Sequence, residues 1–202
     1  MSPSTRVTVV DHGAGNIRSV VRALTHVGAN VQVSADPDTI ASADRLVVPG
    51  QGAFGDCMTR LRAQGLVDPI TAHIRAERPY LGICLGLQVL FDVGREHGEH
   101  QGLGVLAGEC IPLPRAPGLK IPHMGWNQIH GTALGSEADG AWFYFVHGFH
   151  VVPDTQDCDA TTTDYGGDFV SAVTRGNLMA CQFHPEKSQE AGLGLLRRFL
   201  AS

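Results

Sequence analysis

The feature that most constrains this chain is the regular alternation, through its first half, of short apolar runs with amphipathic segments. Apolar, β-branched runs that end at a glycine or a turn predict strands, here Val7–Val10, Val31–Val33, Leu46–Val48 and Tyr80–Ile83. Apolar residues at helical spacing between these runs predict helices over Asn16–Val27, Cys57–Leu66, Val67–Ala76 and Leu85–Phe91. Strands that alternate with helices imply a three-layer α/β fold, in which helices cover both faces of a mostly parallel sheet.

The second half of the chain has a different pattern. Strand-like runs follow one another with Gly, Asp and Asn between them, at Trp126–Ile129, Trp142–Val146, His150–Val152, Phe169–Val173 and Met179–Phe183. We expect an antiparallel or mixed extension of the same sheet, closed by a last helix over Ala191–Leu200, and a flexible loop at residues 94–104. Because the sequence contains no repeat and no low-complexity linker, residues 1–202 are expected to form one domain.

Composition excludes several classes of protein. The net charge is −5 and the basic residues are scattered, so no basic stripe indicates nucleic-acid binding. No apolar stretch is long enough to cross a bilayer, and the first residues lack the apolar segment of a signal peptide, so the cytoplasm is the expected location. The five cysteines include no CxxC pair, which favours reduced thiols over disulfides; they are Cys57, Cys84, Cys110, Cys158 and Cys181.

The fourth predicted strand runs into the segment GICLG, which places Cys84 between Gly82 and Gly86. This pattern matches the nucleophile elbow, with cysteine in the serine position. Glycine tolerates the crowding of such a turn, and ligands of open α/β sheets bind at the carboxyl ends of the strands. The positive end of the helix that follows would favour a thiolate, and the N–H of Leu85 would face an oxyanion. The alternative is that Cys84 is a small core residue.

A thiol nucleophile needs a base, and the base needs an orienting group. His184 follows an apolar run and stands two residues before Glu186. Because residues two apart in an extended chain face the same side, Glu186 could hold Nδ1 of His184 and leave Nε2 for Cys84. The alternative is a loop histidine beside a solvated glutamate.

Three weaker motifs complete the pattern. The turn PGQG after the third strand could supply backbone N–H groups to an oxyanion from Gly50, Gln51 and Gly52, or could be an ordinary turn. The segment GAGNIR resembles the start of a dinucleotide fingerprint, but Arg18 stands where its last glycine belongs, so no nucleotide cofactor is expected. The HxxH pair at residues 97–100 lacks a third ligand nearby and predicts no metal site.

Together, PGQG (49–52), PYLGICLGLQ (79–88) and QFHPEKS (182–188) resemble the class I, triad-type glutamine amidotransferase family. Further stretches are similar to one branch of that family, the glutaminase subunits of imidazole glycerol phosphate synthase. These stretches are DHGAGNIRSVVRAL (11–24), KIPHMGWNQI (120–129), FYFVHGFHV (143–151) and FHPEKSQEAGLGLLRRF (183–199).

The resemblance implies a flavodoxin-like fold and a glutaminase mechanism. Cys84 would attack the carboxamide of glutamine to form a thioester, His184 would serve as acid and then as base, and Glu186 would orient His184. Backbone N–H groups at Leu85 and in the Gly50–Gly52 turn would hold the oxyanion. Two further contacts with glutamine are expected, from Gln88 and from the backbone around Gly148 and Phe149.

The resemblance also implies a partner, a (βα)₈-barrel cyclase subunit that receives the ammonia and makes imidazole glycerol phosphate in histidine biosynthesis. The docking face is expected to include His123, Met124, Trp126 and Asn127, with Asn16 and Arg18 near it, and Lys187 in a salt bridge between the subunits. A tryptophan between glycine and asparagine is typical of an interface with an apolar centre. The alternative for Trp126 is a core aromatic residue.

Some positions depart from the pattern of this branch. His12 stands where tyrosine is common, Gln51 where valine is common, and Gly148-Phe149 where Ser-Tyr or Thr-Tyr is frequent. Three other functions stay open. They are a stand-alone thiol hydrolase or peptidase, which would act without a partner, the glutaminase subunit of another amidotransferase, and a docking subunit with a dead site, against which an intact catalytic set argues.

Overall fold

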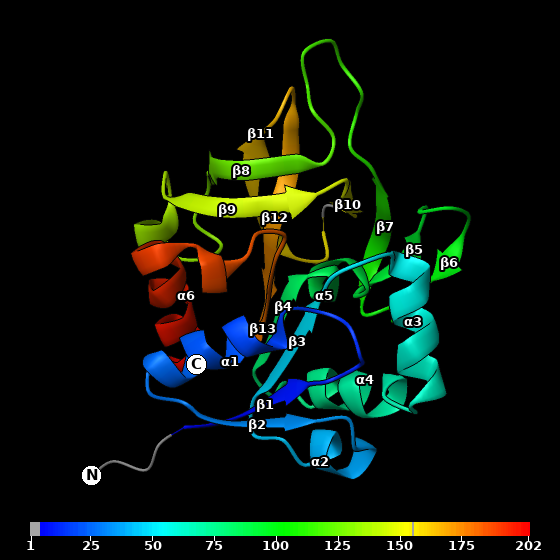
Figure 1. Ribbon diagram of the computed structural model, residues 1–202, viewed down its shortest axis with the longest axis vertical. Coiled ribbons are helices and arrows are strands. Elements are labelled where there is room, and N and C mark those ends of the chain that lie inside the picture. Colours follow the sequence, from blue (N-terminus) through cyan, green and yellow to red (C-terminus); the bar gives the residue numbers. More distant parts are fainter. Residues whose placement is uncertain (1–4, 155) are drawn as a thin grey trace.

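A computed structural model describes residues 5–154 and 156–202 of the chain. Helices lie on both sides of a long twisted sheet (Figure 1). The elements are, in chain order, β1 (Arg6–Val10), α1 (Ile17–His26), β2 (Asn30–Ser34), α2 (Pro37–Ala41), β3 (Leu46–Gly50), α3 (Phe54–Ala63), α4 (Val67–Arg75), β4 (Tyr80–Cys84), α5 (Leu85–Gln88), β5 (Phe91–Gly94), β6 (His100–Gln101), β7 (Leu106–Pro112), β8 (His123–Gln128), η1 (Ser136–Ala138), β9 (Trp142–His147), β10 (Phe149–Pro153), β11 (Asp159–Asp164), β12 (Asp168–Arg175), β13 (Leu178–Cys181), η2 (Pro185–Lys187) and α6 (Gln189–Ala201).

The strands of the main sheet follow the order β2-β1-β3-β4-β13-β12-β10-β7-β5-β6, and β11 pairs with β12. The first five strands in this order run parallel. From β13 onward, β12, β10 and β7 are each antiparallel to the strand before them. This topology confirms the predicted α/β fold, with a parallel half and an antiparallel extension in the C-terminal part of the chain.

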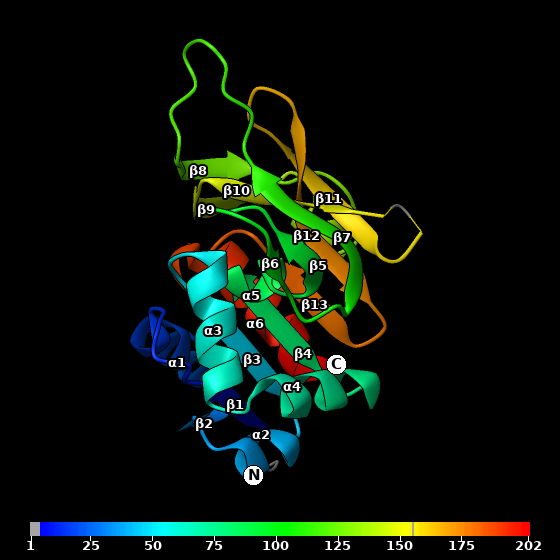
Figure 2. The same ribbon diagram turned by 90° about the vertical axis from the view of Figure 1, so that its right-hand side faces the viewer.

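Each face of the parallel half carries its own hydrophobic core. Helices α3 and α4 cover one face and helices α1 and α6 the other (Figures 1 and 2). The first core gathers large side chains such as Phe54, Met58 and Phe91. The second contains Leu24, Phe183 and Phe199. Because both faces are covered, the central strands β3 and β4 are buried along their whole length and read as continuous runs, whereas the edge strand β2 alternates.

The structure corrects the prediction in three places. The helix after Cys84 ends at Gln88, because Phe91 already belongs to β5, which pairs with β6 and β7. Residues 94–104, expected to be a loop, therefore contain a short hairpin strand, β6. The predicted strands around residues 126 and 142 form a separate two-stranded sheet, β8–β9, rather than an extension of the main sheet.

Several elements were not predicted at all. They are the short helix α2 and the strands β5, β6, β7 and β11. Helix α2 is capped by Asp36, whose carboxylate accepts a hydrogen bond from the backbone N–H of Thr39, a local signal for a helix start. In the part of the chain that the structure describes, no helix is long and apolar enough to cross a membrane.

Candidate active site

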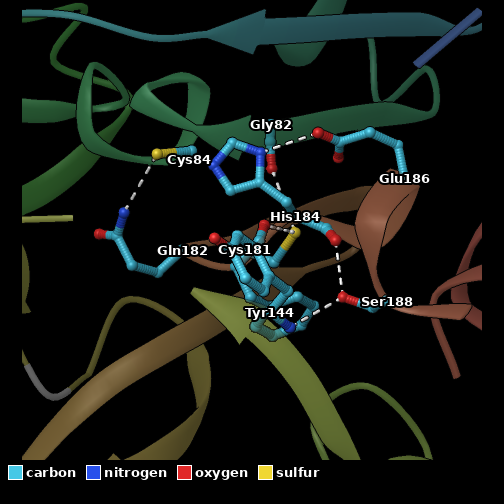
Figure 3. Close-up of polar contacts among 9 residues, drawn as sticks. Gly82, Cys84, Tyr144, Cys181, Gln182, His184, Glu186 and Ser188 are labelled. Atoms are coloured by element: carbon cyan, nitrogen blue, oxygen red, sulfur yellow. Dashed lines mark hydrogen bonds and ion pairs between the residues drawn. The ribbon is translucent and has the colours of Figure 1, made fainter. Parts of the chain in front are cut away.

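The site lies at the carboxyl ends of three neighbouring parallel strands, β3, β4 and β13. Gly50 ends β3 and pairs in register with Cys84, which ends β4. His184 follows β13 after a short connection and opens η2, which contains Glu186. The fold thus brings Cys84, His184 and Glu186 together from distant parts of the chain (Figure 3). An edge formed by strand carboxyl ends is where open α/β sheets bind their ligands.

The backbone turns sharply at Cys84, with φ 55° and ψ −104°. A positive φ is unfavourable for a residue with a side chain and is typically maintained at functional sites by the surrounding structure. The flanking glycines permit the close packing of this turn. A Cβ on Gly82 would lie 2.5 Å from the Gly86 carbonyl oxygen, and a Cβ on Gly86 would lie 1.9 Å from the Val48 carbonyl oxygen. The two glycines are therefore required by the elbow itself.

Helix α5 begins directly after Cys84 but contains only four residues. The helix macrodipole arises from a row of aligned peptide units. A helix of a single turn therefore favours a thiolate only weakly, less than the longer helix expected from the sequence would. The N–H of Leu85 opens the helix and has no intrahelical acceptor, as is general for the first turn. It remains available to an oxyanion beside Cys84.

His184 and Glu186 form a buried pair. Nδ1 of His184 donates to Oε1 of Glu186 at 2.9 Å, and the two side chains are 2% and 1% exposed. Nε2 is turned toward Cys84 (Figure 3) and has no hydrogen-bond partner among the described residues. Burial favours the neutral ring, but the neighbouring Cys84 and Glu186 side chains outweigh it and raise the pKa of His184 to about 9. The ring can therefore carry a proton at neutral pH.

The backbone around His184 is also held in place. Its N–H donates to the Tyr144 carbonyl at 2.8 Å, and its carbonyl accepts from the Ser188 hydroxyl at 2.6 Å. The same hydroxyl accepts from the N–H of Tyr144. These contacts tie η2 to strand β9 and fix the position of the imidazole relative to the elbow.

A cavity of about 440 Å³ opens beside the thiol. Its lining includes Cys84 and six residues predicted for the oxyanion or the substrate, namely Gln51, Gly52, Leu85, Gln88, Gly148 and Phe149. Gly50 is buried next to it, where a Cβ would lie 2.7 Å from Cβ of Leu85. A larger groove of about 700 Å³ lies between α1 and α6 and is not lined by the thiol.

The sequence did not point to Glu96, which lines the cavity from the region expected to be a loop. One of its carboxylate oxygens accepts from the N–H of Phe54 at 2.8 Å. A carboxylate in a pocket of this size suits a cationic group on the ligand. No three side chains of His, Cys, Asp or Glu in the described ranges are grouped so that they could hold a metal ion.

The part of the cavity wall at Gly148 and Phe149 is held by two side chains that donate to one main-chain carbonyl. The Phe149 carbonyl accepts from Nε2 of Gln88 at 3.2 Å and from Nδ1 of His147 at 2.8 Å. The departure at Gly148-Phe149 therefore leaves the contact between this wall and Gln88 intact, because that contact uses the main chain.

Two buried histidines, His123 and His147, adjoin the cavity, and His147 lines it. His123 and His147 share a hydrogen bond of 3.1 Å. Burial lowers the pKa of His123 to about 4 and the pKa of His147 to about 3. Since Nδ1 of His147 donates to the Phe149 carbonyl, its Nε2 must accept the proton of His123 Nδ1 when both rings are neutral. The pair fixes the inner face of the β8–β9 sheet.

The residues predicted for docking do not all lie on one face. Met124 and Trp126 are 63% and 43% exposed, which settles that Trp126 is not a core residue. His123 is buried, because neighbours on a strand point to opposite sides. Asn127 is half-buried and donates to the Asp164 carbonyl. The side chain of His123 therefore does not line the exposed surface.

The other predicted docking residues lie at the rim of the site or beyond it. Lys187 lines the cavity, and its ammonium group lies 5.6 Å from the centre of the Tyr144 ring. Within the described ranges Lys187 has no ion pair with an acidic residue. Asn16 precedes helix α1 and Arg18 is exposed in its first turn.

A strained cysteine elbow, a buried His–Glu pair and an adjoining cavity on an α/β sheet are the arrangement that a triad-type thiol hydrolase requires. The family model described as Glutamine amidotransferase class-I matches residues 8–202, and the chain belongs to that family. A solved structure described as a glutamine amidotransferase has a TM-score of 0.77 and 20% identity to this chain, and covers 97% of this chain and 99% of its own.

Two curated relatives narrow the comparison. The imidazole glycerol phosphate synthase subunit HisH of Aquifex aeolicus is 51% identical over 199 residues, which cover 96% of this chain and 95% of that protein. The chloroplastic imidazole glycerol phosphate synthase hisHF of Arabidopsis thaliana is 42% identical over 199 residues, which cover 96% of this chain but only 34% of that longer protein.

Proposed function

We propose that this chain is the glutaminase subunit of an imidazole glycerol phosphate synthase, which hydrolyses glutamine and supplies ammonia to a cyclase. The observation that carries the proposal is the joint placement of Cys84, His184 and Glu186 beside a cavity that Glu96 and Gln88 line. The identity to HisH proteins over nearly the full length supports the choice of this branch. Residues 1–202 would act as one domain in the cytoplasm, where unpaired thiols such as those of this chain persist.

The first half-reaction makes a thioester. Sγ of Cys84 attacks the carboxamide carbon of glutamine, and the oxyanion is held by the N–H groups of Leu85 and of the Gly50–Gly52 turn. The protonated His184 gives the Nε2 proton to the leaving nitrogen, so that ammonia departs as the carbon–nitrogen bond breaks. The raised pKa of His184, about 9, keeps that proton available at neutral pH.

The second half-reaction consumes one water molecule. Neutral His184 removes a proton from the water through Nε2, and the hydroxide attacks the thioester carbon. The carbon–sulfur bond then breaks and releases glutamate, while the thiolate of Cys84 and the imidazolium are restored. Glu186 accepts from Nδ1 throughout and keeps the ring in one orientation.

The cavity has groups for both ends of glutamine. Glu96 would pair with the α-ammonium group, and Gln88 keeps its Oε1 for the substrate because its Nε2 already donates to the Phe149 carbonyl. The side-chain amide would then extend toward Cys84.

The partner would be a (βα)₈-barrel cyclase in a heterodimer, docked over the β8–β9 sheet. Tyr144 and Val146 of β9 line the cavity, while Trp126 and Met124 pair with them from β8 and are exposed. A partner seated on these residues would cover the side of the cavity from which ammonia leaves. Lys187 at the rim would meet an acidic residue of the cyclase.

Glutamate release from glutamine tests this proposal when it is measured with the chain alone, with a cyclase subunit, and with the cyclase and its ribotide ligand. We expect weak activity for the chain alone and strong activity in the liganded complex. Strong activity that the cyclase does not change would favour a stand-alone hydrolase and overturn the proposal.

A further inference from the structure

Gln182 is a fully buried residue that begins the motif QFHPEKS but received no role in the sequence analysis. It follows β13, and its side-chain amide points toward the thiol of Cys84 (Figure 3). Its Nε2 lies 3.5 Å from Sγ of Cys84. Its Oε1 accepts a hydrogen bond from Nε2 of Gln88 at 3.1 Å. This amide is therefore within hydrogen-bond distance of the thiol, whereas Nε2 of His184 has no partner at that distance among the described residues.

The direction of the Gln182 amide follows from its neighbours. The carbonyl of Phe149 can only accept, so the Gln88 atom that faces it must be the NH₂ group. That same NH₂ group faces Gln182, which must therefore present its oxygen to Gln88. The atom of Gln182 that remains, and that faces Cys84, is then the NH₂ group. The chain of contacts leaves one orientation, with an N–H donor aimed at sulfur.

We propose that Gln182 is a positioning residue that holds and polarises the nucleophile by donating a hydrogen bond to Sγ of Cys84; this rests on the proposed glutaminase function. Hydrogen bonds from a neutral donor to an anion are stronger than those between neutral groups. The donor is needed because helix α5 is one turn long and adds little. Through Gln88, Gln182 also links the thiol to the Phe149 carbonyl, which belongs to the wall of the cavity.

The alternative is that Gln182 only fills space in the core and accepts from Gln88. Two substitutions separate the roles. Gln182→Glu keeps the shape and the oxygen that faces Gln88, but places a second oxygen against the sulfur. Gln182→Met keeps most of the volume and removes both polar groups. A filling role predicts that Gln182→Met, which keeps most of the volume, behaves like the parent protein, whereas a donor role predicts that both variants are impaired.

The readout is the rate at which iodoacetamide alkylates Cys84 in the full chain at neutral pH, followed by mass spectrometry of the Cys84 peptide. This reaction needs neither glutamine nor a partner. We expect both variants to be alkylated about tenfold to a hundredfold more slowly, the range for a hydrogen bond to a charged group. In the complex with the cyclase, kcat for glutamine hydrolysis should fall by a similar factor with little change in KM.

Thr161→Val is the matched control, since it removes a buried hydroxyl that, among the described residues, bonds only to Ser171 and does not line the cavity. It should leave the alkylation rate unchanged. A parent-like alkylation rate in a folded Gln182→Glu or Gln182→Met protein overturns the proposal. If the unsubstituted complex releases no glutamate, the proposed function fails instead, and the alkylation rates still decide the role of Gln182.

Discussion

The parallel half of the main sheet and the two-stranded β8–β9 sheet meet at the same cavity but are built differently. In β3 and β4 every residue is buried, and the elbow that follows is packed so closely that glycine is required. In the β8–β9 sheet, one face is buried and the other exposes Met124, Trp126 and Trp142. The contrast teaches that, under the proposed function, the reacting groups lie on the buried and closely packed region, while the neighbouring two-stranded sheet presents an exposed apolar face on which a partner could dock.

The largest effect should come from the nucleophile itself. Cys84→Ala should reduce glutamate release by the complex about 10⁴-fold or more, because the thioester can no longer form. Folding should survive, since only one sulfur atom is removed. Cys57→Ala is the control: it removes a buried thiol from the opposite core and should lower stability by about 1 kcal/mol while activity stays near that of the parent. Equal losses in the two variants would refute the assignment.

Acid should loosen the β8–β9 sheet before the parallel half. The folded-state pKa values of His123 and His147 lie near 4 and 3, below the ordinary 6.5. Below about pH 6.5 the unfolded chain therefore binds protons that the folded chain does not, and the free energy of unfolding falls by several kcal/mol toward pH 4, because each pH unit costs about 1.4 kcal/mol per proton. His184 does not add to this loss, because its raised pKa gives a stabilisation that is present in acid and disappears only as pH rises through about 9.

Hydrogen exchange at pH 5 and pH 7 locates this effect. Amides of β8 and β9 should lose protection in acid while those of β3 and β4 keep it. His123→Asn should flatten the pH dependence of the unfolding free energy, and His26→Asn, at an exposed position, should not. Equal loss of protection in β8–β9 and in β3 and β4 would show that the two regions do not differ in their stability to acid.

The packing of the elbow can be tested by adding one methyl group. Gly86→Ala places a Cβ 1.9 Å from the Val48 carbonyl oxygen, so the strand or the turn must shift. We expect an unfolding free energy lower by about 1–3 kcal/mol and a clear loss of glutaminase activity. Gly194→Ala in α6 meets no atom within 4 Å and should be neutral or stabilise by up to about 1 kcal/mol. Denaturant unfolding gives the unfolding free energies of both variants. Equal values for Gly86→Ala and Gly194→Ala would show that the elbow can relax around the added methyl group.

The smallest effect concerns the exposed face. Trp126→Ala should weaken cyclase binding about tenfold, as for an aromatic interface residue, and should leave the stability of the free chain nearly unchanged. Val33→Ala, which trims an exposed apolar residue at the far edge of the main sheet, should not affect binding. Calorimetric titration with the cyclase subunit measures the binding of both variants. Unaltered binding by Trp126→Ala would mean that the cyclase docks on another surface.

The features predictable from sequence were those with local causes. The elbow at Cys84 follows from steric limits that its two flanking glycines relieve, and the His184–Glu186 pair follows from two-residue spacing in extended chain. Strand periodicity would also have placed His123 and Met124 on opposite faces. Each of these depends on a few neighbouring residues.

The missed features depend on distant contacts. The apolar stretch after Gln88 is compatible with either a helix or a strand. It forms a strand because it pairs with β7, which lies further along the chain. Gln182 acquires its orientation only by meeting Gln88, which lies 94 positions away in the sequence. Glu96 joins the cavity because the hairpin of β5 and β6 brings it there. No local pattern specifies such contacts.

Covalent labelling by a glutamine analogue that carries an electrophilic carbon in place of the amide nitrogen tests the central claim most directly. After treatment of the complex with the cyclase, mass spectrometry should find the adduct on Cys84 alone, and excess glutamine should prevent it. An adduct on another cysteine, or none on Cys84 in a complex that still hydrolyses glutamine, would contradict the account.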